Sequence, residues 1–315
     1  MTVIQVLGAG AFGTALAVVL ARAGREVRLM GRDPALAQRR ESPRLPGVRF
    51  PDSLRVTDAP DPEAGTTLLA VPMQAQAAFL AEHGHRLTRG PVISCAKGID
   101  LTTLRGAVAL IQGAVPGARA ALLTGPGFAA DIAAGLPTAM VLACADAWGA
   151  EAIQMRLATP TLRLYRTTDV TGAELGGALK NVIAVAAGVA MGAGLGLSAR
   201  AAIIARGQAE MSRLALAMGA RAETLTGLSG LGDLVLTCTS DRSRNYRCGL
   251  ALGAGQPLPQ GETVEGIATA TAAMRLAARH GVGMPLTAMV AELVAGRVTL
   301  AQATRDLLSR PLTTE

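Results

Sequence analysis

The sequence predicts an α/β N-terminal domain, built on a doubly wound and mostly parallel β-sheet, followed by an all-α C-terminal domain. Two features of the 315-residue chain indicate this division. Short apolar runs bounded by glycine or proline alternate with helical stretches in the first half. From about Asp169 strand patterns disappear, and long helical patterns rich in alanine, leucine and methionine replace them. We therefore expect two domains, at residues 1–168 and 169–315.

Local patterns predict the elements in order. A β-rich run at 3–7 leads through a glycine-rich turn into a helix at 14–23, which Gly24 ends, and a second strand follows at 26–30. Later apolar runs flanked by glycine or proline predict strands at 67–71, 92–96, 120–124 and 138–142. Apolar residues at helical spacing predict helices at 169–191, 199–218, 267–280 and 287–295.

Composition excludes several functional classes. Half of the residues are apolar and 17% are charged, which excludes intrinsic disorder. Only seven aromatic residues are present, too few to stack on the bases of single-stranded nucleic acid. The net charge is +7, but apart from the pair Arg39-Arg40 the basic residues are scattered, unlike a nucleic-acid patch or a membrane anchor. The excess charge therefore favours a small phosphorylated ligand, with no nucleic-acid partner.

The cysteines and histidines predict neither a metal site nor disulfides. Four cysteines include no C-x-x-C pair, and three histidines have no partner at metal-ligand spacing. Reduced thiols are typical of the cytoplasm, and no secretory leader is expected. The uncharged stretch between Lys180 and Arg200 contains Asn181, Ser198 and four glycines. We therefore expect a buried helix there, and no stable insertion into a membrane.

A glycine pattern follows the first predicted strand directly. Gly8, Gly10 and Gly13 form G-x-G-x-x-G and open a helix, which is the context of a dinucleotide-binding, Rossmann-type loop. Gly8 would allow the tight turn, Gly10 the approach of the pyrophosphate, and Gly13 close packing of helix on strand. A purely structural turn is the alternative.

The end of the second strand bears on the choice of coenzyme. An acidic residue that binds the ribose is expected there in NAD enzymes, but the sequence reads Gly31-Arg32-Asp33. A guanidinium suits a 2′-phosphate, so Arg32 favours NADP, while Asp33 leaves NAD open. Arg32 as a solvated turn residue is the alternative.

Lysine is rare in this chain, since Lys97 and Lys180 are the only lysines among 30 basic residues. Arginine holds its proton at any accessible pH, whereas lysine can exchange one, so two lysines retained in an arginine-rich chain suggest chemistry. Lys97 follows the strand at 92–96, at the carboxyl edge where such sheets bind ligands. Lys180 lies in the long apolar helix beside Asn181, where a snorkelling side chain is the alternative.

A third motif lies further along the chain. A glycine-dense loop at 227–232 runs into Asp233 and Thr237, and Ser243-Arg244-Asn245 follow. Asp233 can accept hydrogen bonds from hydroxyls, and the three later residues offer a forked charge and hydrogen bonds to a phosphate. A capped helix start at Ser243 is the alternative.

Together these segments resemble the bacterial NAD(P)-dependent glycerol-3-phosphate dehydrogenases over nearly the whole chain. The matching stretches, in family order, are 8–16, 45–47, 70–72, 97–99, 125–126 with 128–129, 174 with 176–182, 206–207 with 210–211, 230–234, 237–238, 243–245 and 265–266. The resemblance implies reduction of dihydroxyacetone phosphate to sn-glycerol 3-phosphate for phospholipid synthesis in the cytoplasm. It implies an NAD(P)H coenzyme and leaves a homodimer open; because of Arg32, we expect NADPH to be preferred and NADH to be possible.

The resemblance also implies roles for individual residues. Lys180 would be the catalytic proton donor and acceptor. The implied substrate-binding residues are Lys97, Gly125, Lys180, Asn181, Asp233, Thr237, Ser243, Arg244 and Asn245. The implied coenzyme-binding residues are Gly8, Gly10, Ala11, Phe12, Gly13, Arg32, Lys97, Ala129, Arg244, Thr263 and Glu265.

One departure from the family pattern concerns the substrate. The family reads Ser-Gly-Pro-Ser-Phe where this chain has Thr124-Gly125-Pro126-Gly127-Phe128, so a hydroxyl expected near the substrate is missing at Gly127. Two other functions fit the same architecture: a dehydrogenase of hydroxy acids, and a noncatalytic protein that senses NADP. Both lysines and Asp233 argue against the sensor.

Overall fold

The computed structural model describes residues 3–87, 90–258 and 263–308, and it contains a sheet domain and a helical domain. Eight strands form one sheet in the order β3-β2-β1-β4-β5-β6-β7-β8, in which only the β6–β7 pair is antiparallel. Their bounds are β1 Ile4–Leu7, β2 Val27–Met30, β3 Leu54–Thr57, β4 Thr66–Leu69, β5 Val92–Ser94, β6 Ala120–Thr124, β7 Thr138–Ala143 and β8 Leu162–Thr167. The predicted fold class is confirmed.

Two strands, β3 and β8, were not predicted. Both lie at the edges of the sheet, where one side of the strand has no hydrogen-bonded neighbour. Exposed side chains interrupt their apolar patterns, as Arg55 does in β3 and as Arg163 does between Leu162 and Leu164 of β8. The central strands, covered on both faces, are continuous apolar runs and are recognisable as such.

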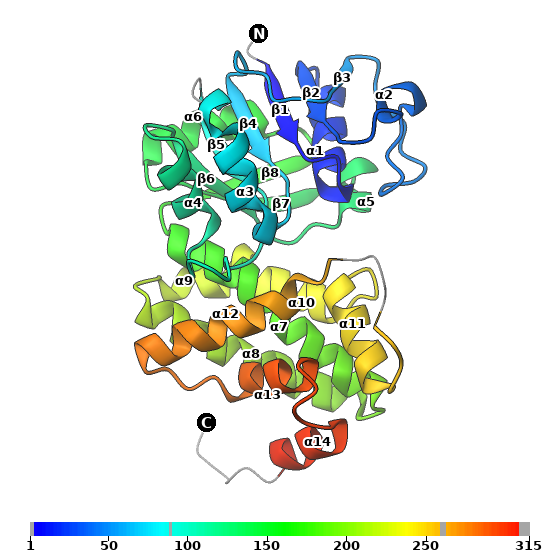
Figure 1. The fold of residues 1–315 in the computed structure, drawn as a ribbon, viewed down its shortest axis with the longest axis vertical. Helices are drawn as coiled ribbons and strands as arrows, with labels where there is room; N and C mark the ends of the chain where they lie inside the picture. Colours follow the sequence, from blue (N-terminus) through cyan, green and yellow to red (C-terminus); the bar gives the residue numbers. More distant parts are fainter. Residues whose placement is uncertain (1–2, 88–89, 259–262, 309–315) are drawn as a thin grey trace.

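Helices cover both faces of the sheet, as Figure 1 shows. The helix α1 begins at Ala11, earlier than predicted, because the tight turn at Gly8 leads directly into it. Gly8 has φ +116°, and a Cβ there would lie 2.8 Å from the carbonyl oxygen of Ala70. The helical segments of this domain are α1 Ala11–Arg22, α2 Leu36–Arg39, α3 Met73–His83, η1 Gly84–Arg86, α4 Ala107–Ala114, α5 Ala129–Ala133 and α6 Ala147–Leu157.

The helical domain is built around α7, Val170–Gly192, which is buried along most of its length. This helix is long and apolar enough to cross a membrane, but 83% of its most apolar window is buried inside the protein. Glycines let α11 approach closely: a Cβ at Gly188 would lie 2.2 Å from the carbonyl oxygen of Tyr246. The segments around α7 are α8 Gly196–Ala217, α9 Ala222–Thr226, η2 Leu228–Gly232, α10 Asp233–Cys238, α11 Arg244–Gly253, α12 Glu265–His280, α13 Pro285–Val294 and α14 Leu300–Leu308.

The last strand ends at Thr167 and α7 begins at Val170, with the Asp169 carboxylate capping that helix through the Gly172 amide at 2.8 Å. We propose a domain boundary at 168/169 on this basis.

Two glutamates of the helical domain bind amides of the sheet domain. Glu174 on α7 accepts from the Val108 amide at 2.8 Å, in the first turn of α4, and Glu265 accepts from the Met73 amide at 3.2 Å, the first residue of α3. The helical domain thus supplies caps for two helices of its neighbour.

Candidate active site

The candidate site forms where the carboxyl ends of β5 and β6 face α7 and α10. Lys97 follows β5, Gly125 follows β6, Lys180 lies in α7, and Asp233 begins α10. Parallel strands place their carboxyl ends on one edge of the sheet, and the helical domain packs against that edge (Figure 1). Residues more than a hundred positions apart therefore meet in one cluster.

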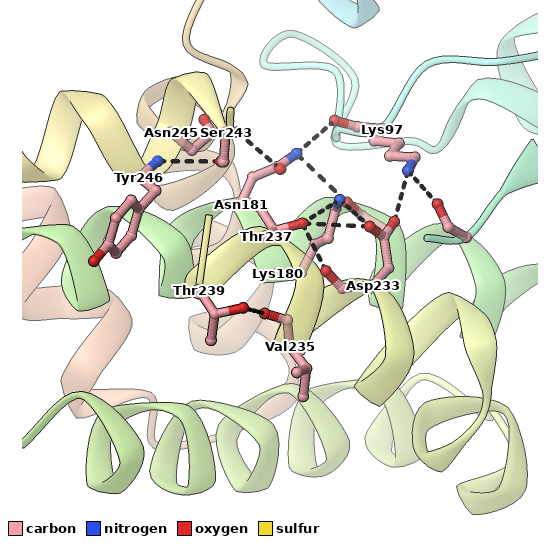
Figure 2. A network of polar contacts seen from close by, with 12 residues as sticks. Lys97, Lys180, Asn181, Asp233, Val235, Thr237, Thr239, Ser243, Asn245 and Tyr246 are labelled. Carbon is pink, nitrogen blue, oxygen red and sulfur yellow. Dashed lines mark hydrogen bonds and ion pairs between the residues drawn. The ribbon is translucent and has the colours of Figure 1, made fainter. Parts of the chain in front are cut away.

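Asp233 binds both lysines of the chain (Figure 2). Lys97 Nζ donates to Asp233 Oδ2 at 2.6 Å and to the Gly125 carbonyl oxygen at 2.8 Å. Lys180 Nζ donates to Asp233 Oδ1 and, at 2.7 Å, to Thr237 Oγ1. The Thr237 hydroxyl in turn donates to the Asp233 carbonyl oxygen at 2.6 Å, which leaves its lone pair for Lys180. The structure thus brings together five of the residues that the sequence singled out.

Burial tunes the charges of this cluster. Desolvation is the largest cause of a lowered pKa at Lys180; the Lys97 cation also lowers this pKa and Asp233 opposes the shift, with a net pKa of about 7. Burial alone would raise the pKa of Asp233, but Lys180 and Lys97 outweigh it and lower that pKa. Asp233 therefore stays ionised, while Lys180 can exchange its proton near neutral pH.

A chain of amides joins the cluster to α11 and α12. Asn245 Nδ2 donates to Asn181 Oδ1 at 2.9 Å, and the Gly266 amide donates to Asn245 Oδ1 at 2.9 Å. Asn181 Nδ2 reaches the carbonyl oxygen of Lys97 at 3.4 Å. Asn181 and Asn245 thus brace the segment that carries Lys97.

Ser243 and Arg244 lie at the start of α11. The Ser243 hydroxyl accepts from the Tyr246 amide at 3.2 Å, so Ser243 caps this helix, as its alternative interpretation predicted. Arg244 is exposed, and its charge lowers the pKa of Glu265, although burial outweighs it and raises that pKa overall. Arg244 and Glu265 therefore lie within electrostatic reach of each other at the domain interface.

The glycine loop fits a dinucleotide. A Cβ at Gly13 would lie 2.1 Å from the Gly8 carbonyl oxygen, whereas a Cβ at Gly10 would meet nothing within 4 Å. The helix α1 has no side-chain cap and no acidic residue in its first turn, so the amides around Ala11 and Phe12 are open to a pyrophosphate.

The remaining predicted coenzyme residues lie on separate elements. Arg32 is exposed directly after β2. Ala129 is the first residue of α5, and Thr263 is exposed two residues before α12. Both oxygens of Asp33 are engaged: Oδ1 accepts from the Ala35 amide at 2.9 Å and Oδ2 from Arg39.

Gly177 and Thr124 also lie at the site, although neither was predicted as a site residue. A Cβ at Gly177 would lie 2.6 Å from Thr124 Oγ1 and 3.6 Å from Lys97 Cγ, so this glycine lets α7 approach the sheet edge. The glycine pair at 176–177, one helical turn before Lys180, was the available signal. Thr124 Oγ1 is buried and has no hydrogen-bond partner among the described residues.

The space beside Gly127 is largely filled. A Cβ at this position would lie 3.0 Å from Thr138 Cγ2 and 3.3 Å from Ile132 Cδ1. A serine, as the family pattern has it, would need these neighbours to shift. No cluster that could hold a metal ion is found within the described residues.

Comparison with known proteins identifies relatives over the full chain. Residues 3–150 match the model of the NAD-dependent glycerol-3-phosphate dehydrogenase N-terminus, and residues 169–305 match the model of its C-terminus. Glycerol-3-phosphate dehydrogenases that use NAD(P)+ are 62% identical in Paracoccus denitrificans, with 99% of both chains covered, and 60% identical in Cereibacter sphaeroides, with 99% and 100% covered. The crystal structure of glycerol-3-phosphate dehydrogenase from Coxiella burnetii superposes with a TM-score of 0.93 at 35% identity, over 98% of this chain and 99% of that one.

Proposed function

The chain belongs to the NAD-dependent glycerol-3-phosphate dehydrogenase family, and from this premise we propose that Lys180 transfers the proton in its reaction. That reaction is the reduction of dihydroxyacetone phosphate to sn-glycerol 3-phosphate with NAD(P)H. The observation that supports the role of Lys180 is its position: it is buried at the sheet edge, bound to Asp233 and Thr237, with its pKa lowered to about 7.

The two ammonium groups are prepared to bind one substrate oxygen. An ammonium has three N–H donors, and the described residues provide two acceptors to each lysine. One N–H of Lys180 and one of Lys97 are therefore left for the C2 oxygen. Bound NAD(P)H supplies the hydride to the C2 carbon. Lys180 Nζ gives its proton to the developing alkoxide, and Lys97 polarises the same oxygen.

Asp233 holds both lysines in place, and its negative charge offsets part of their combined positive charge in a buried site. Thr237 directs the Lys180 ammonium, and Gly125 directs that of Lys97, through the acceptors described above. Asn181, braced by Asn245, positions Lys97 through its carbonyl oxygen. In the reverse direction the same Lys180, once deprotonated, takes the hydroxyl proton of glycerol 3-phosphate.

The substrate phosphate is proposed to bind at the start of α11. Arg244 is exposed there and offers a forked pair of N–H donors, and the helix N-terminus favours an anion. Ser243 has its lone pair engaged in the helix cap but retains its proton for a phosphate oxygen. This arrangement would fix C2 beside the two lysines.

The coenzyme is proposed to lie along the glycine loop, with its pyrophosphate over Gly10, Ala11 and Phe12. Gly8 and Gly13 shape that turn, and Arg32 at the end of β2 would read a 2′-phosphate, so that NADPH is preferred over NADH. Further contacts are proposed from Lys97, Ala129, Arg244, Thr263 and Glu265.

A spectrophotometric assay tests this function directly. Purified protein is given dihydroxyacetone phosphate with NADPH or NADH, and coenzyme oxidation is followed. We expect turnover with both and a lower KM for NADPH. Turnover that requires a 2-oxo acid instead would support a hydroxy-acid dehydrogenase, and no turnover with any carbonyl compound would support a sensor.

The cellular setting remains a proposal. Glycerol 3-phosphate is the backbone of phospholipids, so the product would enter phospholipid synthesis. All four cysteines are buried free thiols, which suits the reducing cytoplasm. A homodimer stays a prediction, and sedimentation of the purified protein would test it.

A further inference from the structure

The segment after β2 lies against the glycine loop. A Cβ at Gly31 would lie 2.5 Å from Leu36 Cδ2 and 3.0 Å from the Ala9 Cβ, and Leu36 is buried. The Ser42 hydroxyl, also buried, donates to the Ala9 carbonyl oxygen at 3.2 Å. Gly31 and Ser42 therefore lie against the loop at Ala9, and position 31 has no room for an acidic side chain without moving Leu36.

Asp33 directly follows Arg32 and is the acidic residue considered for binding a ribose. Both of its carboxylate oxygens already accept hydrogen bonds within the protein. Its Oδ1 accepts from the Ala35 amide at 2.9 Å, and its Oδ2 accepts from the guanidinium of Arg39, the last residue of α2. The Arg39 hydrogen bond is the first cause, and the Ala35 amide the second, of a lowered pKa at Asp33. Asp33 is thus an ionised group turned toward α2.

The Asp33–Arg39 ion pair affects the net charge and the hydrogen-bonding capacity of this segment. Arg32, Asp33 and Arg39 together carry a charge of +1, as counted from their residue types. Without Arg39 the pair Arg32 and Asp33 would be neutral, and Asp33 Oδ2 would be free to accept from a ribose hydroxyl or to repel a phosphate, while Oδ1 would still accept from the Ala35 amide. The state in which Arg39 binds Asp33 suits NADPH, and the state without Arg39 suits NADH.

We propose that Arg39 is a positioning residue for coenzyme specificity, which favours NADPH by holding Asp33 away from the ribose 2′ position. This inference rests on the proposed reading of the 2′-phosphate by Arg32. Arg39 acts through Asp33, so its effect should depend on whether residue 33 carries a charge.

The test uses the coenzyme fragments as well as turnover. Calorimetric titration measures the Kd of 2′,5′-ADP and of 5′-ADP for the wild type, Arg39→Gln, Arg39→Lys and the double variant Arg39→Gln/Asp33→Asn. KM and kcat for NADPH and NADH are measured in parallel. Arg55→Gln is the matched control, because Arg55 is an exposed arginine on the neighbouring edge strand β3 and its loss changes the net charge equally.

We expect Arg39→Gln to weaken 2′,5′-ADP about three- to tenfold, the effect of one unit charge near a phosphate at an exposed site. Binding of 5′-ADP should be unchanged or tighter, and the effect on turnover should fall on the KM for NADPH rather than on kcat. Arg39→Lys and the double variant should restore the discrimination, and Arg55→Gln should retain it.

Two results would overturn the proposal while the proposed function stands. One is an Arg39→Gln protein with wild-type discrimination, and the other is a double variant that remains impaired, since Arg39 would then act on the phosphate or the scaffold and not through Asp33. A wild type that binds 2′,5′-ADP and 5′-ADP equally would instead refute the reading of the 2′-phosphate by Arg32, and this inference with it.

Discussion

Replacement of Lys180 by arginine tests the proposed proton transfer most directly, because it keeps the positive charge beside Asp233 and removes the exchangeable proton. With its pKa lowered to about 7, the lysine can give up and take back a proton near neutral pH. Arginine has a pKa above 12, so less than about 10⁻⁵ of it is neutral at pH 7 and its proton is a poor donor to an alkoxide.

The expected loss follows from this difference. General acid catalysis by a positioned group contributes about 10²–10⁴-fold, so kcat for reduction should fall by that factor, or about 2.7–5.4 kcal/mol in activation free energy. Single-turnover oxidation of NADPH by dihydroxyacetone phosphate measures the chemical step without product release. Lys97→Arg is the comparison, and it should change both kcat and KM through orientation. A Lys180→Arg enzyme within tenfold of the wild-type rate would refute the assignment.

The lowered pKa of Lys180 also predicts opposite pH dependences for the two directions. Reduction needs the protonated amine, so its rate should be constant at low pH and fall as the pH rises through about 7. Oxidation of glycerol 3-phosphate needs the free amine, so its rate should rise through the same range. If kcat changed with pH in the same sense for reduction and for oxidation, the result would contradict the role of Lys180.

The remaining predictions concern labelling and ligand binding. An amine-directed reagent can modify only Lys97, Lys180 and the N-terminal amine, so it should abolish activity. Bound NADPH and substrate should protect the enzyme from this loss. If mass spectrometry shows that Lys180 is fully modified while turnover is retained, Lys180 is excluded as the proton donor. Arg244→Lys keeps the charge but loses the fork, so the KM for dihydroxyacetone phosphate should rise, and wild-type kinetics would exclude Arg244 as the phosphate ligand. Arg32→Ala should raise the KM for NADPH far more than that for NADH, with a loss of about 1.5–3 kcal/mol in binding, whereas equal effects would leave Arg32 as a turn residue.

Elements of the fold could be predicted where the pattern of their own residues determines their structure. Central strands covered on both faces appear as apolar runs, and the helices α7, α8, α12 and α13 appear as apolar patterns at helical spacing, so these were found. In contrast, α9, α10 and α14 were not predicted, and α11 entered only as the alternative interpretation of Ser243. The edge strands β3 and β8, of four and six residues, were missed because exposed side chains such as Arg55 and Arg163 interrupt their apolar patterns. Their pairing depends on neighbours that are distant in the sequence.

Residues of the site could be predicted from the sequence, but the contacts between them could not. The rarity of lysine pointed to Lys97 and Lys180, and both lie in the cluster. That one carboxylate, Asp233, binds both could not be read from the chain, because three segments must first fold together. The unpartnered hydroxyl of Thr124 and the contact that requires Gly177 depend on the same meeting of domains.

The two glutamate caps make the domains depend on each other for stability. If the chain were cut at the proposed boundary, α3 and α4 would each lose the carboxylate that Glu265 and Glu174 provide. An N-terminal helix cap contributes about 0.5–2 kcal/mol, so the isolated sheet domain would lose stability at two helices whose own sequences supply no side-chain cap. The same dependence couples the two halves during unfolding. The chain should therefore melt as one cooperative unit, although its buried apolar residues form three separate clusters.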